Sequence, residues 1–173
     1  KKFYNLSLKG ESAPSLAGGG LRGLNLIVPG LADKFMRVAY HHLMSIGLKK
    51  GDKVPDIYGK INNRVKMKIV IGNKQMGGPI DYMYIGPMNI SAKYDVDRNQ
   101  LIFNGNLIDS MTYSKTHELY FRLRARREDQ RFDPSAKAGN TPKIYGKSPS
   151  KGDSVGRIVI TDSVPRNAII VRI

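Results

Sequence analysis

Basic side chains at alternating positions are the clearest candidates for chemistry in this sequence. Arg122, Arg124 and Arg126 alternate with apolar residues over 119–125, a pattern typical of a β-strand with one apolar face and one cationic face. Such a strand spaces its guanidinium groups by roughly 6.5–7 Å, close to the reach between successive phosphates on an extended nucleic-acid strand. The row therefore predicts contact with a polyanion, and a solvated charged face is the alternative.

Further cations extend this candidate surface. Residues 64–71 also alternate between basic and apolar types, which predicts a second strand with a cationic face. Residues 133–154 are rich in Pro, Gly, Ser and Lys without periodicity, so we expect a mobile basic loop there. Mobile lysines suit diffuse attraction to phosphates, worth about 1 kcal/mol each near an anionic membrane. The candidate residues outside the row are Arg127, Lys66, Lys68, Lys137, Lys143, Lys147 and Lys151.

Tyrosines near these segments could offer bases a stacking surface. Packing inside the sheet is their more frequent use. The tyrosines concerned are Tyr58, Tyr82, Tyr84, Tyr113 and Tyr120.

Signatures of catalysis and of metal binding are missing from the sequence. Phosphate-loop, dinucleotide-binding, zinc-protease and nucleophile-elbow motifs are absent, and so is cysteine. The adjacent His41 and His42 would point about 100° apart on a helix, which suits one metal ion poorly. Asp95-x-Asp97-x-Asn99 opens like a calcium loop but lacks the later Gly and Glu, so it indicates a turn. We expect no enzyme, no metal and no cofactor.

Net charge is the strongest global signal. Lys and Arg total 29 against 14 Asp and Glu, which gives +15 at pH 7. Such an excess repels itself in a folded chain and usually exists to meet a negative partner. RNA, DNA and an anionic membrane surface are the candidates. Hydrophobic residues make up 40%, enough for a folded core, and no apolar run approaches the roughly 18 residues of a membrane span.

The pattern of elements predicts an α+β fold, mainly antiparallel β-sheet with one principal helix at about 31–46. Apolar residues recur there at three- and four-residue steps, and Gly47 is placed to end the helix. Strands are expected over 24–28, 64–71, 81–85, 88–96, 100–107, 119–125, 156–161 and 168–173, with a turn at 97–99.

The domain organisation predicted is a flexible, extended N-terminal arm (1–30) followed by one globular domain (31–173). Phe3, Leu6 and Leu8 are apolar and are tethered by Gly18-Gly19-Gly20. An arm of this kind can dock on a neighbouring copy, which makes these residues candidates for self-association. Packing against the chain's own domain is the alternative.

Two short motifs, Val65-Lys66-Met67 and Asp81-Tyr82-Met83-Tyr84-Ile85-Gly86, follow each other in the chain. They resemble stretches of the rhabdovirus matrix proteins, and Ser12-Ala13-Pro14 is similar to a budding motif of that family, with Glu11 in place of its leading proline. The resemblance implies a small basic structural protein that self-assembles and bridges nucleocapsid RNA or protein to an anionic membrane. Its expected locations are the virion, the host cytoplasm and the inner membrane face. A coat protein that binds the genome directly and a cellular RNA-binding or ribosomal protein are the alternatives.

Overall fold

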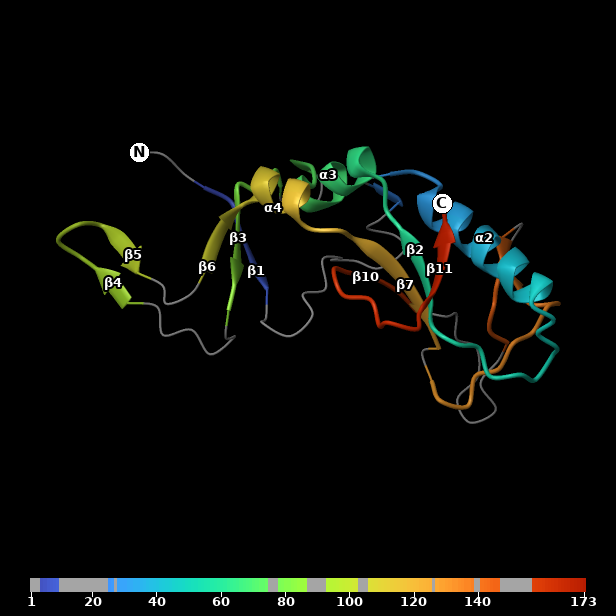
Figure 1. The fold of residues 1–173 in the computed structure, drawn as a ribbon. Coiled ribbons are helices and arrows are strands. Elements are labelled where there is room, and N and C mark those ends of the chain that lie inside the picture. Colours follow the sequence, from blue (N-terminus) through green and yellow to red (C-terminus); the bar gives the residue numbers. More distant parts are fainter. Residues whose placement is uncertain are drawn as a thin grey trace.

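The structure is a computed structural model that describes residues 4–9, 25–26, 28–74, 78–86, 93–102, 106–125, 127–138, 141–146 and 157–173. Its elements form an elongated molecule, with α2 at one end and the β4–β5 hairpin at the other (Figure 1). In chain order they are β1 (Leu6–Lys9), α2 (Leu31–Ser45), β2 (Ile57–Lys60), α3 (Asn63–Ile71), β3 (Tyr82–Ile85), β4 (Lys93–Asp95), β5 (Gln100–Ile102), β6 (Asn106–Asp109), α4 (Ser110–Thr116), β7 (Tyr120–Arg124), β8 (Lys137–Ala138), β9 (Thr141–Pro142), β10 (Arg157–Thr161) and β11 (Ile169–Arg172).

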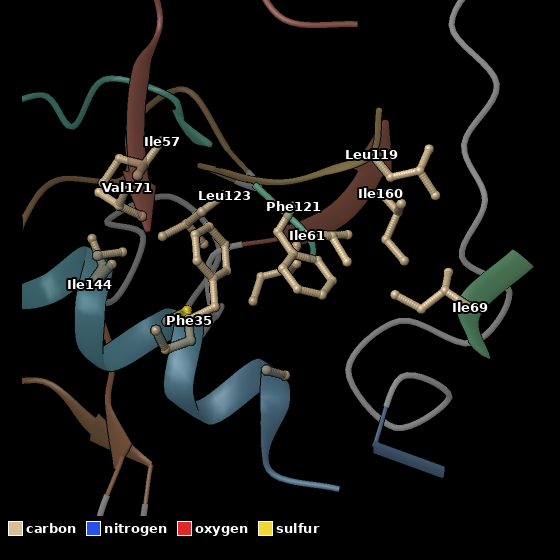
Figure 2. Close-up of a cluster of buried hydrophobic side chains, with 14 of the residues drawn as sticks. Phe35, Ile57, Ile61, Ile69, Leu119, Phe121, Leu123, Ile144, Ile160 and Val171 are labelled. Atoms are coloured by element: carbon tan, nitrogen blue, oxygen red, sulfur yellow. The ribbon is translucent and has the colours of Figure 1, made fainter. Parts of the chain in front are cut away.

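A four-stranded sheet of order β10-β7-β2-β11 forms the main body. β7 pairs antiparallel with β10 and β2, whereas β11 pairs parallel with β2. One face of this sheet packs on α2, where the Phe35 ring lies 5.4 Å from that of Phe121. Figure 2 shows Phe35 directed from α2 toward Phe121 and Leu123. This layer of helix on sheet holds most of the hydrophobic core.

Helix α2 confirms the helix predicted at about 31–46. The residues that it buries follow the predicted apolar stripe, and its C-terminus closes in a Schellman motif. Leu48 N donates to Leu43 O, and Gly47 N donates to Met44 O. Gly47 has φ 81, a left-handed conformation that glycine adopts without steric cost.

A second, three-stranded sheet has the order β1-β3-β6, with β1 parallel and β6 antiparallel to β3. Helices α3 and α4 pack on each other between the two sheets (Figure 1). The β4–β5 hairpin projects beyond this sheet, and Asp95 Oδ1 accepts hydrogen bonds from Asp97 N and Arg98 N in its turn. The turn predicted at 97–99 is confirmed.

The α+β prediction is confirmed in this coarse form, but the single principal helix is wrong and the larger sheets include parallel pairs. Among the described residues there are three α-helices rather than one principal helix. The two larger sheets are mixed, because β1 and β11 each pair parallel with a neighbour, while the other pairings of the described strands are antiparallel. The parallel pairs join segments far apart in the chain, which local alternation does not reveal.

The strand predicted over residues 64–71 is wrong, because this segment is helix α3. Its buried residues are Lys66, Ile69 and Val70, a helical spacing, whereas Met67 is 38% exposed. Asn62 caps the helix, since its side-chain oxygen accepts a hydrogen bond from Val65 N at 3.0 Å. The segment is short, so its apolar residues fit both the two-residue period of a strand and the 3.6-residue period of a helix. The cap at Asn62 and the packing of the buried residues favour the helix.

The remaining predicted strands are largely present. The predictions over 81–85, 119–125, 156–161 and 168–173 correspond to β3, β7, β10 and β11, and β4 and β5 pair as a hairpin. Residues 25 and 26 are helical, so the strand at 24–28 is wrong. Helix α4 was not predicted; Asp109 caps it by accepting a hydrogen bond from Thr112 N at 2.9 Å. Within the described part of the chain, no helix has the length and apolar character needed to span a membrane.

Candidate polyanion interface

Strand β7 turns its arginines away from the core. Phe121 and Leu123 are fully buried against α2, while Arg122 and Arg124 are half-buried on the opposite face. The alternation predicted for this strand is confirmed at these positions. Arg126, the third member of the predicted row, lies outside the described residues, as does the side chain of Arg157 opposite Arg124 in the register.

Neighbouring strands add cations to the same face. Lys60 of β2 pairs in register with Tyr120 of β7 and with Arg172 of β11, so these side chains share the face that carries Arg122. Lys60 and Arg172 are both exposed. We call this surface the open face: the side of the four-stranded sheet opposite α2, with Lys60, Arg122, Arg124 and Arg172.

Arg122 is already engaged within the chain. Its Nη2 lies 2.5 Å from Asp56 Oδ2 and its Nε lies 2.8 Å from the same oxygen. Its guanidinium carbon also lies 5.9 Å from the centre of the Tyr58 ring. The hydrogen bond to Asp56 raises the pKa of Arg122. Arg122 is therefore held in place and largely neutralised.

Lys60 has an acidic partner as well. Its Nζ lies 3.0 Å from Glu118 Oε2, and this hydrogen bond raises the pKa of Lys60. Both side chains are more than half exposed, so solvent screens the pair. By contrast, neither Arg124 nor Arg172 forms an ion pair with any acid in the described ranges. These two arginines carry uncompensated charge on the open face.

An open hollow of about 900 Å³ lies where β7 ends. We call it the basic hollow; its lining carries five cations and three acids. The lining residues are Lys53, Val54, Asp56, Arg122, Arg124, Ala125, Arg127, Glu128, Asp129, Gln130 and Arg131. The open face thus ends in a concave surface with a net positive charge.

The predicted lysines on α3 do not join this surface. Lys66 is only 3% exposed, and its Nζ donates to the carbonyl oxygen of His117 at 2.8 Å. The prediction that Lys66 contacts a polyanion is therefore wrong, because helix formation turned it inward. Lys68 is exposed, but it lies on α3 rather than on the sheet.

The segment predicted as a mobile basic loop contains two short strands in its described ranges, 133–138 and 141–146. β8 and β9 pair as a short ladder, which carries the exposed Lys137, and Lys143 is half-buried just after it. Ile144 and Tyr145, with exposures of 0% and 1%, belong to the hydrophobic core. Lys147 and Lys151 lie outside the described residues.

The tyrosines that could stack on bases are mostly packing residues. Tyr58, Tyr84 and Tyr113 are almost completely buried. Tyr120 is half-buried on the open face, and Tyr82 is half-buried beside Tyr4, whose ring centre lies 5.4 Å away.

The candidate self-association residues belong to the second sheet. Leu6 and Leu8 lie in β1, which pairs with β3 of the same chain; Leu6 is half-buried and Leu8 is 47% exposed. Leu107 of β6 lies in the same cross-strand row as Leu8 and is 57% exposed. Phe3 lies outside the described residues, and the division into an arm and a domain stays a prediction.

The sequence patterns did not point to Lys53, Lys60 and Arg172 as members of the basic surface, whereas Arg131 continues the charge that follows the arginine row. Lys60 and Arg172 are each the last and only charged residue of a short strand, so neither strand shows a row of alternating cations. Their convergence depends on the parallel pairing of β11 with β2, which no local pattern indicates.

Comparison of the chain with protein-family models, with curated proteins and with solved structures gives no match. The function of the chain is therefore inferred from the placement of its side chains.

Proposed function

We propose that this chain is a structural protein that binds a polyanion through the open face of its four-stranded sheet. The observation that carries the proposal is the gathering of cations from three adjacent strands, β7, β2 and β11, on the face opposite α2. Like charges brought together repel each other, so their placement on one surface is favourable when phosphates neutralise them. Arg124, which has no acidic partner among the described residues, makes the largest contribution.

The role that we propose is matrix-like. The chain would self-assemble, and it would bridge nucleocapsid RNA or protein to an anionic membrane. It would do so in the virion and at the inner face of the host membrane. The net charge of +15 supports both negative partners. Exposed apolar side chains on the second sheet, Leu8 and Leu107, support contact between copies.

Binding of fluorescently labelled single-stranded RNA over a range of salt concentrations tests the main proposal. Changing Lys60, Arg124 and Arg172 together to Gln should lower the affinity and flatten its salt dependence, by about 0.7 in slope for each phosphate that the variant no longer neutralises. The matched control changes Lys34, Arg37 and Lys49 to Gln. Lys34 and Arg37 are exposed on α2, which packs on the other face of the sheet, and Lys49 is exposed in the turn after that helix. Equal losses of affinity in the two triple variants would contradict the proposed face.

Two further measurements test the matrix-like role. Flotation with vesicles that contain phosphatidylserine should recover the protein, and vesicles of phosphatidylcholine alone should not. Sedimentation should show self-association that weakens when Leu8 and Leu107 are changed to Thr, which keeps strand propensity while removing apolar surface. Closed shells without lipid binding would indicate a coat protein, and a monomer at high concentration would indicate a cellular RNA-binding protein.

A further inference from the structure

Backbone hydrogen bonds join the two chain segments that form the walls of the basic hollow. One wall comes from Lys53 to Asp56 before β2, and the other comes from Arg127 to Arg131 after β7. Backbone hydrogen bonds tie the walls together, since Phe132 N donates to Asp52 O and Gly51 N donates to Phe132 O, both at 2.9 Å. The two walls therefore hold a fixed spacing.

Gln130 fixes the shape of the second wall from inside. It is only 1% exposed, and its Oε1 accepts a hydrogen bond from Arg127 N at 3.2 Å. Its Nε2 donates to the carbonyl oxygen of Gly146 at 3.4 Å. A buried amide with both ends engaged holds the arginine-bearing turn before any ligand arrives, which reduces the entropy lost on binding.

The cations of the hollow divide into those that are engaged and those that are not. Arg122 is paired with Asp56. Arg131 donates from Nη1 to the carbonyl oxygens of Glu128 and Gln130, which orients its guanidinium without neutralising it. Arg124 has no described acidic partner.

Arg127 provides a second observation that points to a ligand. Its Nε is buried and has no hydrogen-bond acceptor among the described residues. A buried donor without an acceptor is unfavourable, and an anionic oxygen in the hollow would remove this cost after a small rotation of the side chain. A guanidinium presents its donors as a planar fork, a shape that suits two oxygens of one phosphate.

We propose that the basic hollow is the primary phosphate site of the chain and that it binds a backbone phosphate of single-stranded RNA. Arg124 and Arg127 hold the phosphate oxygens, Lys53 and Arg131 supply the surrounding positive charge, and Arg122 in the lining is neutralised by Asp56. This inference rests on the proposed function and deepens it. The open face with its half-buried Tyr120 is the track along which the strand continues.

The shape of the hollow favours a strand over a membrane. A membrane is a flat sheet of charge, whereas these cations line a concave surface that includes the buried Val54 and Gln130. Glu128 is exposed at the same site and would repel a continuous anionic plane. A flexible strand can place one phosphate in the hollow and keep the next ones away from this carboxylate.

The test compares two double variants of equal charge in binding a labelled 12-nucleotide single-stranded RNA. Arg124→Gln with Arg127→Gln should weaken binding about tenfold or more, since each removes charged hydrogen bonds to phosphate. Lys60→Gln with Arg172→Gln, at the other end of the open face, should weaken it less than about threefold. Arg127→Lys keeps the positive charge but lacks the planar guanidinium, so its RNA affinity should lie between those of the wild type and Arg127→Gln.

Thermal unfolding of each variant shows whether the fold survives, and Arg124→Gln alone serves if the double variant is unstable. Equal weakening by the two double variants would contradict the hollow as the primary phosphate site, but it would remain consistent with binding along the open face. A wild-type chain that binds no RNA would overturn the proposed function as well. Vesicles with phosphatidylserine give a third arm: if the hollow variant loses vesicle binding as strongly as RNA binding, the assignment to RNA is wrong.

Discussion

The side-chain nitrogen of Lys66 lies 2.8 Å from the carbonyl oxygen of His117, and Lys66 is only 3% exposed. This hydrogen bond joins helix α3 to the residue that follows α4. The chain thus uses one of its many cations as an internal link, because the carbonyl beyond a helix C-terminus offers a partial negative charge.

Replacing Lys66 should change stability rather than binding. Lys66→Ala leaves the His117 carbonyl without its partner and opens space between α3 and α4, which should lower the free energy of unfolding by about 2 to 3 kcal/mol. RNA affinity of the folded variant should stay within about twofold of wild type, because Lys66 is buried away from the open face. Lys68→Ala, exposed on the same helix, is the control and should change stability by about 0.5 kcal/mol or less. A large loss of affinity in folded Lys66→Ala would contradict the buried position.

The elements with one clear period could be predicted from the sequence. Helix α2 follows from an apolar stripe that ends at Gly47, and β7 follows from the strict alternation around Leu123. In both, the local preference agrees with the packing.

Helix α3 and the sheet pairings could not be predicted in this way. Residues 64–71 alternate and also carry apolar side chains at helical spacing, so the period alone does not decide, and the cap at Asn62 is the local signal that favours the helix. β1 and β11 find their partners across long stretches of chain, and each pairing is set by burial in the assembled fold.

The sequence predicts the positive charge of the candidate site, but it does not predict which acids neutralise part of that charge. The arginines of β7 are visible in the sequence, whereas the acid that neutralises Arg122 is Asp56, 66 positions away. The hollow depends likewise on Gln130, whose sequence position carries no signal of burial.

Removing the acidic partner of Arg122 should strengthen binding to RNA. Asp56→Asn keeps the shape of the side chain and releases a guanidinium into the hollow, so the salt dependence should steepen by up to about 0.7 in slope. The stability cost should be about 1 kcal/mol or less, because both partners are roughly one-third exposed and solvent screens the pair. Anisotropy titrations at several salt concentrations measure the slope. Weaker binding by Asp56→Asn would show that the pair positions the hollow.

Gly59 lies where β2 crosses Phe35 of α2. A Cβ at this position would stand 2.7 Å from Phe35 Cε2, closer than van der Waals contact allows. Gly59→Ala should therefore lower the free energy of unfolding by about 1 to 3 kcal/mol, measured by urea denaturation. Phe35→Leu removes the clashing ring atoms, so the double variant should be more stable than the sum of the single losses predicts. Strict additivity of the two stability losses would mean that α2 and β2 can move apart at this contact without cost.

Tyr113 should make the fold sensitive to alkaline pH. Burial is the main cause that raises the pKa of this phenol, and the carboxylate of Asp162, 3.1 Å from its hydroxyl, raises the pKa further. The unfolded chain releases this proton near pH 10 while the folded chain retains it, so the stability that Tyr113 contributes is present below pH 10 and is lost as the pH rises above it. Tyr113→Phe should lose about 1 kcal/mol at neutral pH with its hydrogen bond and show a shallower decline above about pH 10. Urea denaturation across this pH range measures both. Tyr113 ionising near pH 10 in the folded protein, seen as tyrosinate absorbance missing from Tyr113→Phe, would contradict the buried contact with Asp162.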